Sequence, residues 1–152
     1  MRTPAQIARH PIHPMLVPIP IGCWVLSLGC DAAFVLGAGA THWAIVSFWA
    51  MLAGLLGAIA AAVPGIIDML SLRGTPKKLA LTHMALNVTV VVLYAMNFGM
   101  RVNGGAIAGL PLAFSVVGIT LLIASGWLGG HMVYVHGVAV DVNQAENKQR
   151  ET

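Results

Sequence analysis

The stretch WAIVSFWAMLAGLLGAIAAAVPGII, residues 43–67, contains no charged side chain. An α-helix rises about 1.5 Å per residue, so about 20 apolar residues cross the hydrocarbon core of a bilayer. The run is too long for a barrel strand and shows no alternation of apolar and polar residues. It therefore predicts a membrane-spanning helix and decides the fold class.

Three other segments have the same apolar character. The four helices are expected over about residues 15–36, 43–70, 79–100 and 107–130, and the last one is open to extension as far as Val140. Short connections force consecutive helices to run antiparallel. The sequence thus predicts an all-α, integral membrane, four-helix up-down-up-down bundle that forms one domain over residues 1–152. The polar tail, residues 141–152, is expected to fray.

The composition supports a membrane protein and excludes a soluble enzyme. Of the 152 residues, 58% are hydrophobic and 9% are charged, whereas roughly 25% are charged in a soluble domain. The mean hydropathy is +0.83. The net charge of +3 comes without a dense Lys/Arg stripe, so a nucleic-acid partner is disfavoured. The bilayer is the expected surrounding.

The basic residues predict the orientation of the helices. With four spans, both termini and the connection over residues 71–78 share one side of the membrane. That side carries Arg2, Arg9, Arg73, Lys77, Lys78, Lys148 and Arg150. The other side carries only Arg101. By the positive-inside rule, both termini are expected in the cytoplasm of a multi-pass protein of the bacterial inner membrane.

This topology brings most of the histidines to the cytoplasmic end. The residues expected there are His10, His13, His83, His131, His136 and Asp68, while His42 lies at the other end. A single interfacial histidine is most often only a solvated side chain. However, polar groups at or inside the apolar boundary are costly and mark functional sites, which favours a shared site.

The first hypothesis for this site is haem b. Non-covalent haem needs two axial ligands from different helices, and His83 with His131 is the preferred pair. His13 and His136 are the substitutes or a second pair. No Cys-x-x-Cys-His motif is present, so a covalently attached haem is excluded. The expected role is electron transfer with a redox partner protein, without catalysis.

Three alternatives stay open. A zinc, iron or copper ion could be held by His10, His13, Asp68, His83 and His131, although no His-x-x-x-His pair makes the spacing specific. Transport or proton conduction could use Asp31, Asp68 and the histidines as relay groups, but four spans without an evident repeated half would require a homo-oligomer. The last alternative is an accessory structural subunit without a cofactor. No catalytic motif favours an enzyme.

Asp31 forms a separate case near the opposite end of the bundle. Asn97 and Arg101, four residues apart at the matching end of the third helix, are its expected partners. A buried Asp31–Arg101 pair is predicted as a structural clamp. The other interpretation of Asp31 is a proton-relay carboxylate.

Several motifs resemble a known family. They are RHPIHPMLV at 9–17, Asp31, GIID at 65–68, His83 with Asn87, and GHMVYVHG at 130–137. Together they resemble a bacterial membrane family catalogued as domain of unknown function number twenty-two thirty-one. The resemblance implies a four-helix integral membrane domain and brings no agreed activity. Relatives fused to a Rieske-type iron–sulfur domain imply a link to electron transfer by analogy.

Overall fold

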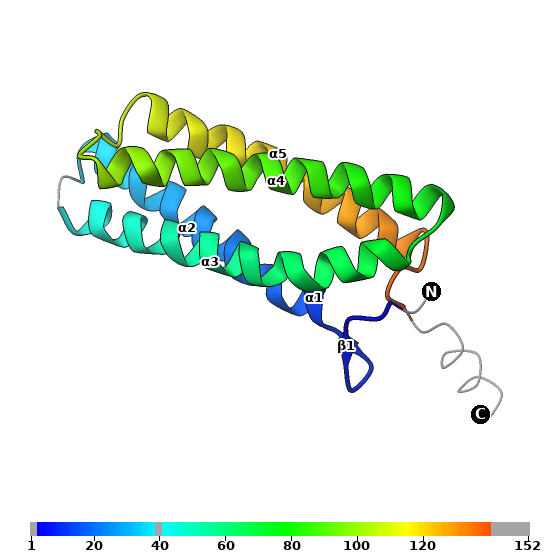
Figure 1. The fold of residues 1–152 in the computed structure, drawn as a ribbon. Helices are drawn as coiled ribbons and strands as arrows, with labels where there is room; N and C mark the ends of the chain where they lie inside the picture. The colour runs from blue at the N-terminus through cyan, green and yellow to red at the C-terminus, as the bar shows by residue number, and fades with distance from the viewer. Residues whose placement is uncertain (1–2, 39–40, 141–152) are drawn as a thin grey trace, which may run out of the picture.

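A computed structural model describes residues 3–38 and 41–140 of the chain. Four helical segments in these ranges are long and apolar enough to cross a membrane: Ile12–Gly37, Thr41–Ser71, Gly74–Val102 and Leu110–Tyr134. They run alternately along one axis (Figure 1). The prediction of an all-α four-helix bundle is confirmed.

The first span is divided by its prolines. A two-stranded antiparallel sheet, β1 (Gln6–Ile7) and β2 (His10–Pro11), precedes the span. The span itself consists of α1 (Ile12–Leu16), α2 (Pro18–Ala33) and the short π-helical segment η1 (Phe34–Ala38). Proline has no N–H to donate within a helix, so α1 and α2 separate at Val17, directly before Pro18.

The other three spans are continuous helices: α3 (Thr41–Ser71), α4 (Gly74–Val102) and α5 (Leu110–Tyr134). Thus α5 begins three residues later than expected, after Gly109 at φ +79°, and ends four residues later. The helix does not continue to Val140. The chain leaves it after Tyr134 and turns at Gly137, where φ is +62°.

The bundle is built from two helical hairpins. α2 packs along α3 and α4 packs along α5, while contacts of α3 with α4 and of α2 with α5 close the ring. Consequently α2 and α4 lie on one diagonal of the bundle, and α3 and α5 lie on the other. Figure 1 shows the start of α1, the α3–α4 connection and the end of α5 at the same end of the bundle.

The aromatic core shows that the two hairpins repeat one another. Trp24 of α2 and Tyr94 of α4 stack at 4.4 Å between ring centroids and 5° between planes. Trp24 also lies against Gly54 of α3, and Tyr94 lies against Gly118 of α5. The aromatic residues are 70 positions apart and the glycines are 64 positions apart. The structure therefore reveals a repeated half that is not evident from the sequence.

The same 70-residue offset recurs at two other levels of the bundle. His13 faces His83 and Asp31 is paired with Arg101. Within each hairpin the three members are 11 and 7 residues apart, which is about 16 Å and about 10 Å along a helix. A pseudo-two-fold axis thus runs along the bundle, with a histidine pair near one end, an aromatic pair in the middle and an ion pair near the other end.

The contact of Trp24 with the Gly54 backbone gives a first prediction. A Cβ atom at position 54 clashes with the indole ring of Trp24, so Gly54→Ala should lower the free energy of unfolding by about 1–3 kcal/mol. Thermal unfolding in detergent, followed by tryptophan fluorescence, measures this loss. Gly29→Ala in α2 is the control, because nothing lies within 4 Å of its added Cβ atom. Equal melting temperatures for the two variants would contradict the close-packing account.

Candidate functional site

The end of the bundle near the α2–α3 and α4–α5 connections contains a buried ion pair. Asp31 is fully buried. Its carboxylate accepts two hydrogen bonds from Arg101, at 2.8 Å from Nη1 and 2.5 Å from Nη2. The Ser47 hydroxyl donates to Asp31 at 2.5 Å and accepts from Arg101 Nη1 at 2.8 Å. Ser27 joins this group through a 2.9 Å contact with Ser47.

Asn97 extends the polar group to the fourth helix. Its Oδ1 accepts from Arg101 Nε at 2.9 Å. Its Nδ2 donates to the backbone oxygen of Pro111 at 2.7 Å and to the Ser115 hydroxyl at 2.8 Å. Tyr94 donates to the Ser115 backbone oxygen at 3.4 Å. Side chains of α2, α3, α4 and α5 are thereby joined in one network.

This network has the character of a structural clamp. Buried charges are tolerated when they are paired and when hydrogen bonds satisfy their remaining donors and acceptors. The Asp31 carboxylate is held by Arg101 and Ser47, and all three Arg101 nitrogens donate. Asn97 does not bind Asp31 directly but holds Arg101 in place. Every guanidinium nitrogen and both carboxylate oxygens therefore have a partner within the protein.

The histidine pair lies at the opposite end, where His13 of α1 contacts α3. His13 Nδ1 is 2.8 Å from the backbone oxygen of Ala61. Gly65, four residues after Ala61, gives the ring room, because a Cβ atom there would lie 2.8 Å from Nδ1. Gly65 and the Ala61 carbonyl of α3 therefore fix the position of the His13 ring.

His83 of α4 is held against α5 in the same way. His83 Nδ1 is 2.9 Å from the backbone oxygen of Ser125. Gly129 again follows four residues later, and a Cβ atom there would lie 3.3 Å from His83 Cε1. The carbonyl and glycine of α5 are each 64 positions after their counterparts Ala61 and Gly65 in α3. Each half of the bundle thus contains the same arrangement, in which a backbone carbonyl contacts Nδ1 of a histidine and a glycine four residues later packs against its ring. We call this arrangement a histidine holder.

These contacts determine the tautomer of both rings. A backbone carbonyl oxygen can only accept a hydrogen bond, so Nδ1 carries the proton in His13 and in His83. In the neutral imidazole, Nε2 then has the free lone pair. Within the described residues, neither Nε2 has a hydrogen-bond partner. Each ring therefore has a ligand atom directed away from the helix that holds Nδ1.

The two rings face one another across the pseudo-two-fold axis. Their centroids are 6.3 Å apart and their planes are perpendicular. Both side chains are half-buried. His83 lies five residues after Lys78, which places it about 7–8 Å deeper along α4 than that charged residue. The pair is therefore close to one membrane interface but inside the apolar part of the bundle.

The structure pairs His131 with His136 instead of His83. These two rings are 5.3 Å apart at the end of α5, and His131 is exposed. Gly129 faces His83, and a residue two positions further along a helix is turned by about 200° from it. His131 therefore points away from His83, and the described residues show no ring contact between them.

The remaining predicted site residues have other partners. His10 Nδ1 contacts the backbone oxygen of Ala8 at 2.9 Å, within its own exposed turn. Asp68 accepts a hydrogen bond from the Ala5 backbone N–H at 2.8 Å and so anchors the N-terminal segment rather than a histidine. Among the described residues, no group of three or more His, Cys, Asp or Glu side chains could hold a metal ion.

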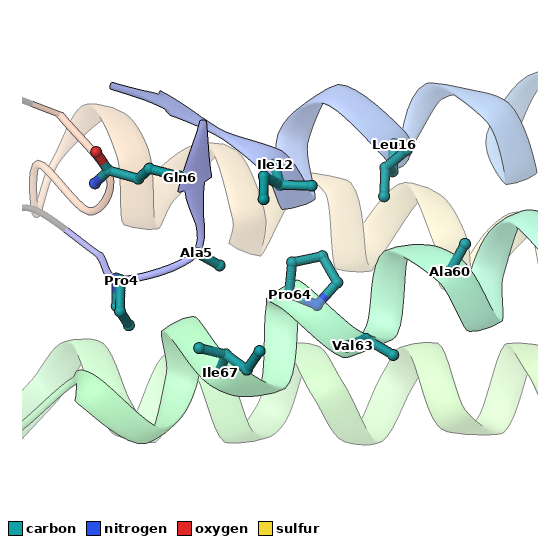
Figure 2. Close-up of a pocket in the computed structure, with 9 residues that line it drawn as sticks. All are labelled: Pro4, Ala5, Gln6, Ile12, Leu16, Ala60, Val63, Pro64 and Ile67. Atoms are coloured by element: carbon teal, nitrogen blue, oxygen red, sulfur yellow. The ribbon is translucent and has the colours of Figure 1, made fainter. Parts of the chain in front are cut away.

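The anchored N-terminal segment borders a groove on the outside of the His13 holder. Figure 2 shows this segment facing α1 and α3 across the groove. Its lining comprises Pro4, Ala5, Gln6, Ile12, Leu16, Ala60, Val63, Pro64 and Ile67. The only polar side chain among these, Gln6, donates to the Thr3 backbone oxygen at 2.5 Å. The groove is therefore an apolar surface with no chemistry of its own.

Comparison with known proteins adds a family but no activity. A family profile described as "Predicted membrane protein (DUF2231)" matches residues 9–142. No curated protein and no solved structure matches the chain. The match includes both histidine holders and the ion pair, and the description gives no function to any of them.

The 70-residue offset is the signal in the sequence that could have revealed the histidine pair. Once Asp31–Arg101 and Trp24–Tyr94 are aligned by it, His13 falls on His83. The hydrogen bond from His83 to the backbone oxygen of Ser125 has no such signal in the residue type, because every residue provides a backbone carbonyl.

The ion pair gives a second prediction. Asp31→Asn or Arg101→Met leaves the other charge buried and unpaired, so each should cost about 3–5 kcal/mol of unfolding free energy. Because the two positions are equivalent about the axis, the double variant Asp31→Arg with Arg101→Asp should recover part of this loss. Chemical unfolding in detergent measures all three variants. A charge-swapped variant no more stable than Arg101→Met would refute the pseudo-symmetric pairing.

Proposed function

The chain belongs to this DUF2231 family of predicted membrane proteins, and we propose that it is a redox protein holding one haem b between His13 and His83. The proposal rests on one observation. Two imidazoles from different helices, both protonated at Nδ1, face each other across the bundle axis with both Nε2 atoms free. Polar side chains within membrane spans are costly to place there, and those that are present commonly serve a function.

The spacing of the rings suits two ligands on opposite sides of one metal ion. An imidazole nitrogen lies about 1.2 Å from the ring centroid and binds a metal ion at about 2.0 Å. Two imidazoles in line across one ion therefore have centroids about 6.4 Å apart. The observed distance is 6.3 Å. Hydrogen bonds from Nδ1 to carbonyl groups are also what fixes the orientation of metal-binding histidines.

The number of protein ligands favours haem over a bare ion. Structural zinc takes four ligands, and catalytic zinc usually takes three from the protein. The described residues offer no group of three such side chains. Haem iron needs only two axial ligands from the protein, because the porphyrin supplies the other four. A bis-histidine pair is therefore a complete ligand set for haem and an incomplete one for zinc.

The helices beside the pair carry small side chains at this depth. α3 contributes Ala58, Ala61 and Gly65, and α5 contributes Ser125 and Gly129. Since α3 and α5 lie on one diagonal of the bundle and the histidine-bearing helices lie on the other, these small residues lie on either side of the line that joins the two histidines. Small side chains allow a flat macrocycle to approach the helix backbones.

The role that follows is one-electron transfer close to one face of the membrane. Haem supplies the redox chemistry, and this chain supplies ligation, orientation and an apolar surrounding. His131 and His136, which lie together at the surface of the same end, are outside this ligand pair. A separate redox partner protein is then required, since the chain offers no second cofactor motif.

The absorption spectrum tests this proposal. The protein expressed with adequate haem supply and purified in detergent should show a Soret band, and dithionite should sharpen its α and β bands. His13→Ala and His83→Ala should each abolish the low-spin spectrum, because each removes one axial ligand. His136→Ala and His10→Ala are the matched controls and should retain it.

A colourless wild-type preparation would overturn the haem assignment. Elemental analysis of that sample would then distinguish a bare metal ion from an accessory or transporting subunit without a cofactor. A haem spectrum that survives His13→Ala but is lost in His131→Ala would instead support the His83–His131 pair.

We also propose that both termini face the cytoplasm. Arg101, the only basic residue expected on the opposite side, is neutralised by Asp31 inside the bundle. The basic residues Lys77 and Lys78 near the start of α4 are therefore not balanced by a free basic residue at the other end of the bundle. This difference in positive charge strengthens the positive-inside argument. In a bacterial host, a C-terminal green fluorescent protein fusion should fluoresce, and a C-terminal alkaline phosphatase fusion should be inactive. The reverse result would invert the orientation.

A further inference from the structure

The two histidine holders differ in one hydrogen bond. His83 Nδ1 is 2.9 Å from the Ser125 hydroxyl as well as 2.9 Å from the Ser125 backbone oxygen. His13 Nδ1 has only the backbone oxygen of Ala61, because alanine stands where the second hairpin has serine. The Nδ1 proton of His83 is therefore shared between two acceptors, and that of His13 is bound by one.

Asn87 fixes the hydroxyl that makes this difference. Its Nδ2 lies 2.7 Å from Ser125 Oγ and 2.8 Å from the backbone oxygen of His83. Since that backbone oxygen can only accept, the Asn87 atom is the amide nitrogen and it donates to both oxygens. Val17 is the counterpart of Asn87, 70 positions earlier, and its side chain cannot donate a hydrogen bond. The asymmetry thus involves two residues of the second hairpin.

The directions of these bonds follow from the donors. Asn87 Nδ2 donates to Ser125 Oγ, and the protonated Nδ1 of His83 lies 2.9 Å from the same oxygen. The Ser125 hydroxyl therefore accepts two hydrogen bonds at this site. An acceptor on Nδ1–H draws its proton away from the ring and makes Nε2 a more basic ligand. His83 should consequently be the stronger electron donor of the two histidines.

We propose that Ser125 and Asn87 are positioning residues that lower the reduction potential of the group bound between His13 and His83. This inference rests on the haem assignment above. A more basic axial imidazole stabilises the oxidised iron more than the reduced iron, and hydrogen bonds to axial ligands are one of the protein's means of setting this balance. The hydroxyl of Ser125 supplies the bond, and the amide of Asn87 holds it in place.

Redox titration of the haem-loaded, full-length protein tests the proposal. Ser125→Ala and Asn87→Val turn the second holder into a copy of the first, so each should raise the midpoint potential. We expect a threefold to tenfold change in the ratio of oxidised to reduced protein at a fixed potential, and tenfold corresponds to about 59 mV for one electron. Thr120→Val is the matched control, because it removes an α5 hydroxyl that binds only the backbone oxygen of Val116.

A second measurement follows the histidine itself without any cofactor. In ¹⁵N-histidine-labelled protein free of haem, His83 should appear as the Nδ1-protonated tautomer. Ser125→Ala should shift its Nδ1 resonance and leave that of His13 in place. This readout also shows whether each variant retains the folded holder.

The outcomes separate this inference from the proposed function. A wild-type protein without a haem spectrum overturns both. A wild-type haem spectrum with equal midpoint potentials in wild type, Ser125→Ala and Thr120→Val overturns only the tuning role. A higher potential in Ser125→Ala and Asn87→Val, with Thr120→Val unchanged, supports it.

Discussion

Inside a bilayer, a polar side chain can be satisfied only by the protein itself, because acyl chains neither donate nor accept hydrogen bonds. This constraint distinguishes the two polar layers of the bundle by how their polar atoms are bound. Around Asp31 and Arg101 every charged atom has a partner, so that layer holds the helices together. Around His13 and His83 one nitrogen of each ring is bound and the other is free. The histidine layer is therefore the one that we propose as a ligand site.

The repeated hairpin explains why these layers lie on the axis. Each hairpin places a histidine, an aromatic residue and a charged residue on its first helix at the same spacing, and it places small residues opposite them on its second helix. Packing two such hairpins face to face brings equivalent residues together across the axis. Equal residues at one level, His13 and His83, give two facing imidazole rings. Unlike residues at another level, Asp31 and Arg101, give an ion pair.

Much of the fold could be predicted from the sequence, and the site only in part. Four long apolar segments and short connections were enough for the four-helix bundle, which is confirmed, and the motifs were enough for the family, which is also confirmed. The ends of the helices were predicted less accurately than their number. Leu110 begins α5 after a glycine at positive φ, whereas apolarity alone continued back to Ile107. Hydropathy reports which residues suit lipid, and it contains little information about where helical hydrogen bonding starts.

The sequence by itself determined that the helices lie in lipid, how many of them span it, and at which end of the bundle each histidine lies. These features depend only on the order of apolar and polar residues along the chain. Only the tertiary structure decided that His83 faces His13 rather than His131, and that Asp68 binds the Ala5 backbone. Those choices depend on the rotation of each helix about its own axis. That rotation is set by close contacts such as Trp24 on Gly54 and His13 on Gly65, which join residues distant in the chain.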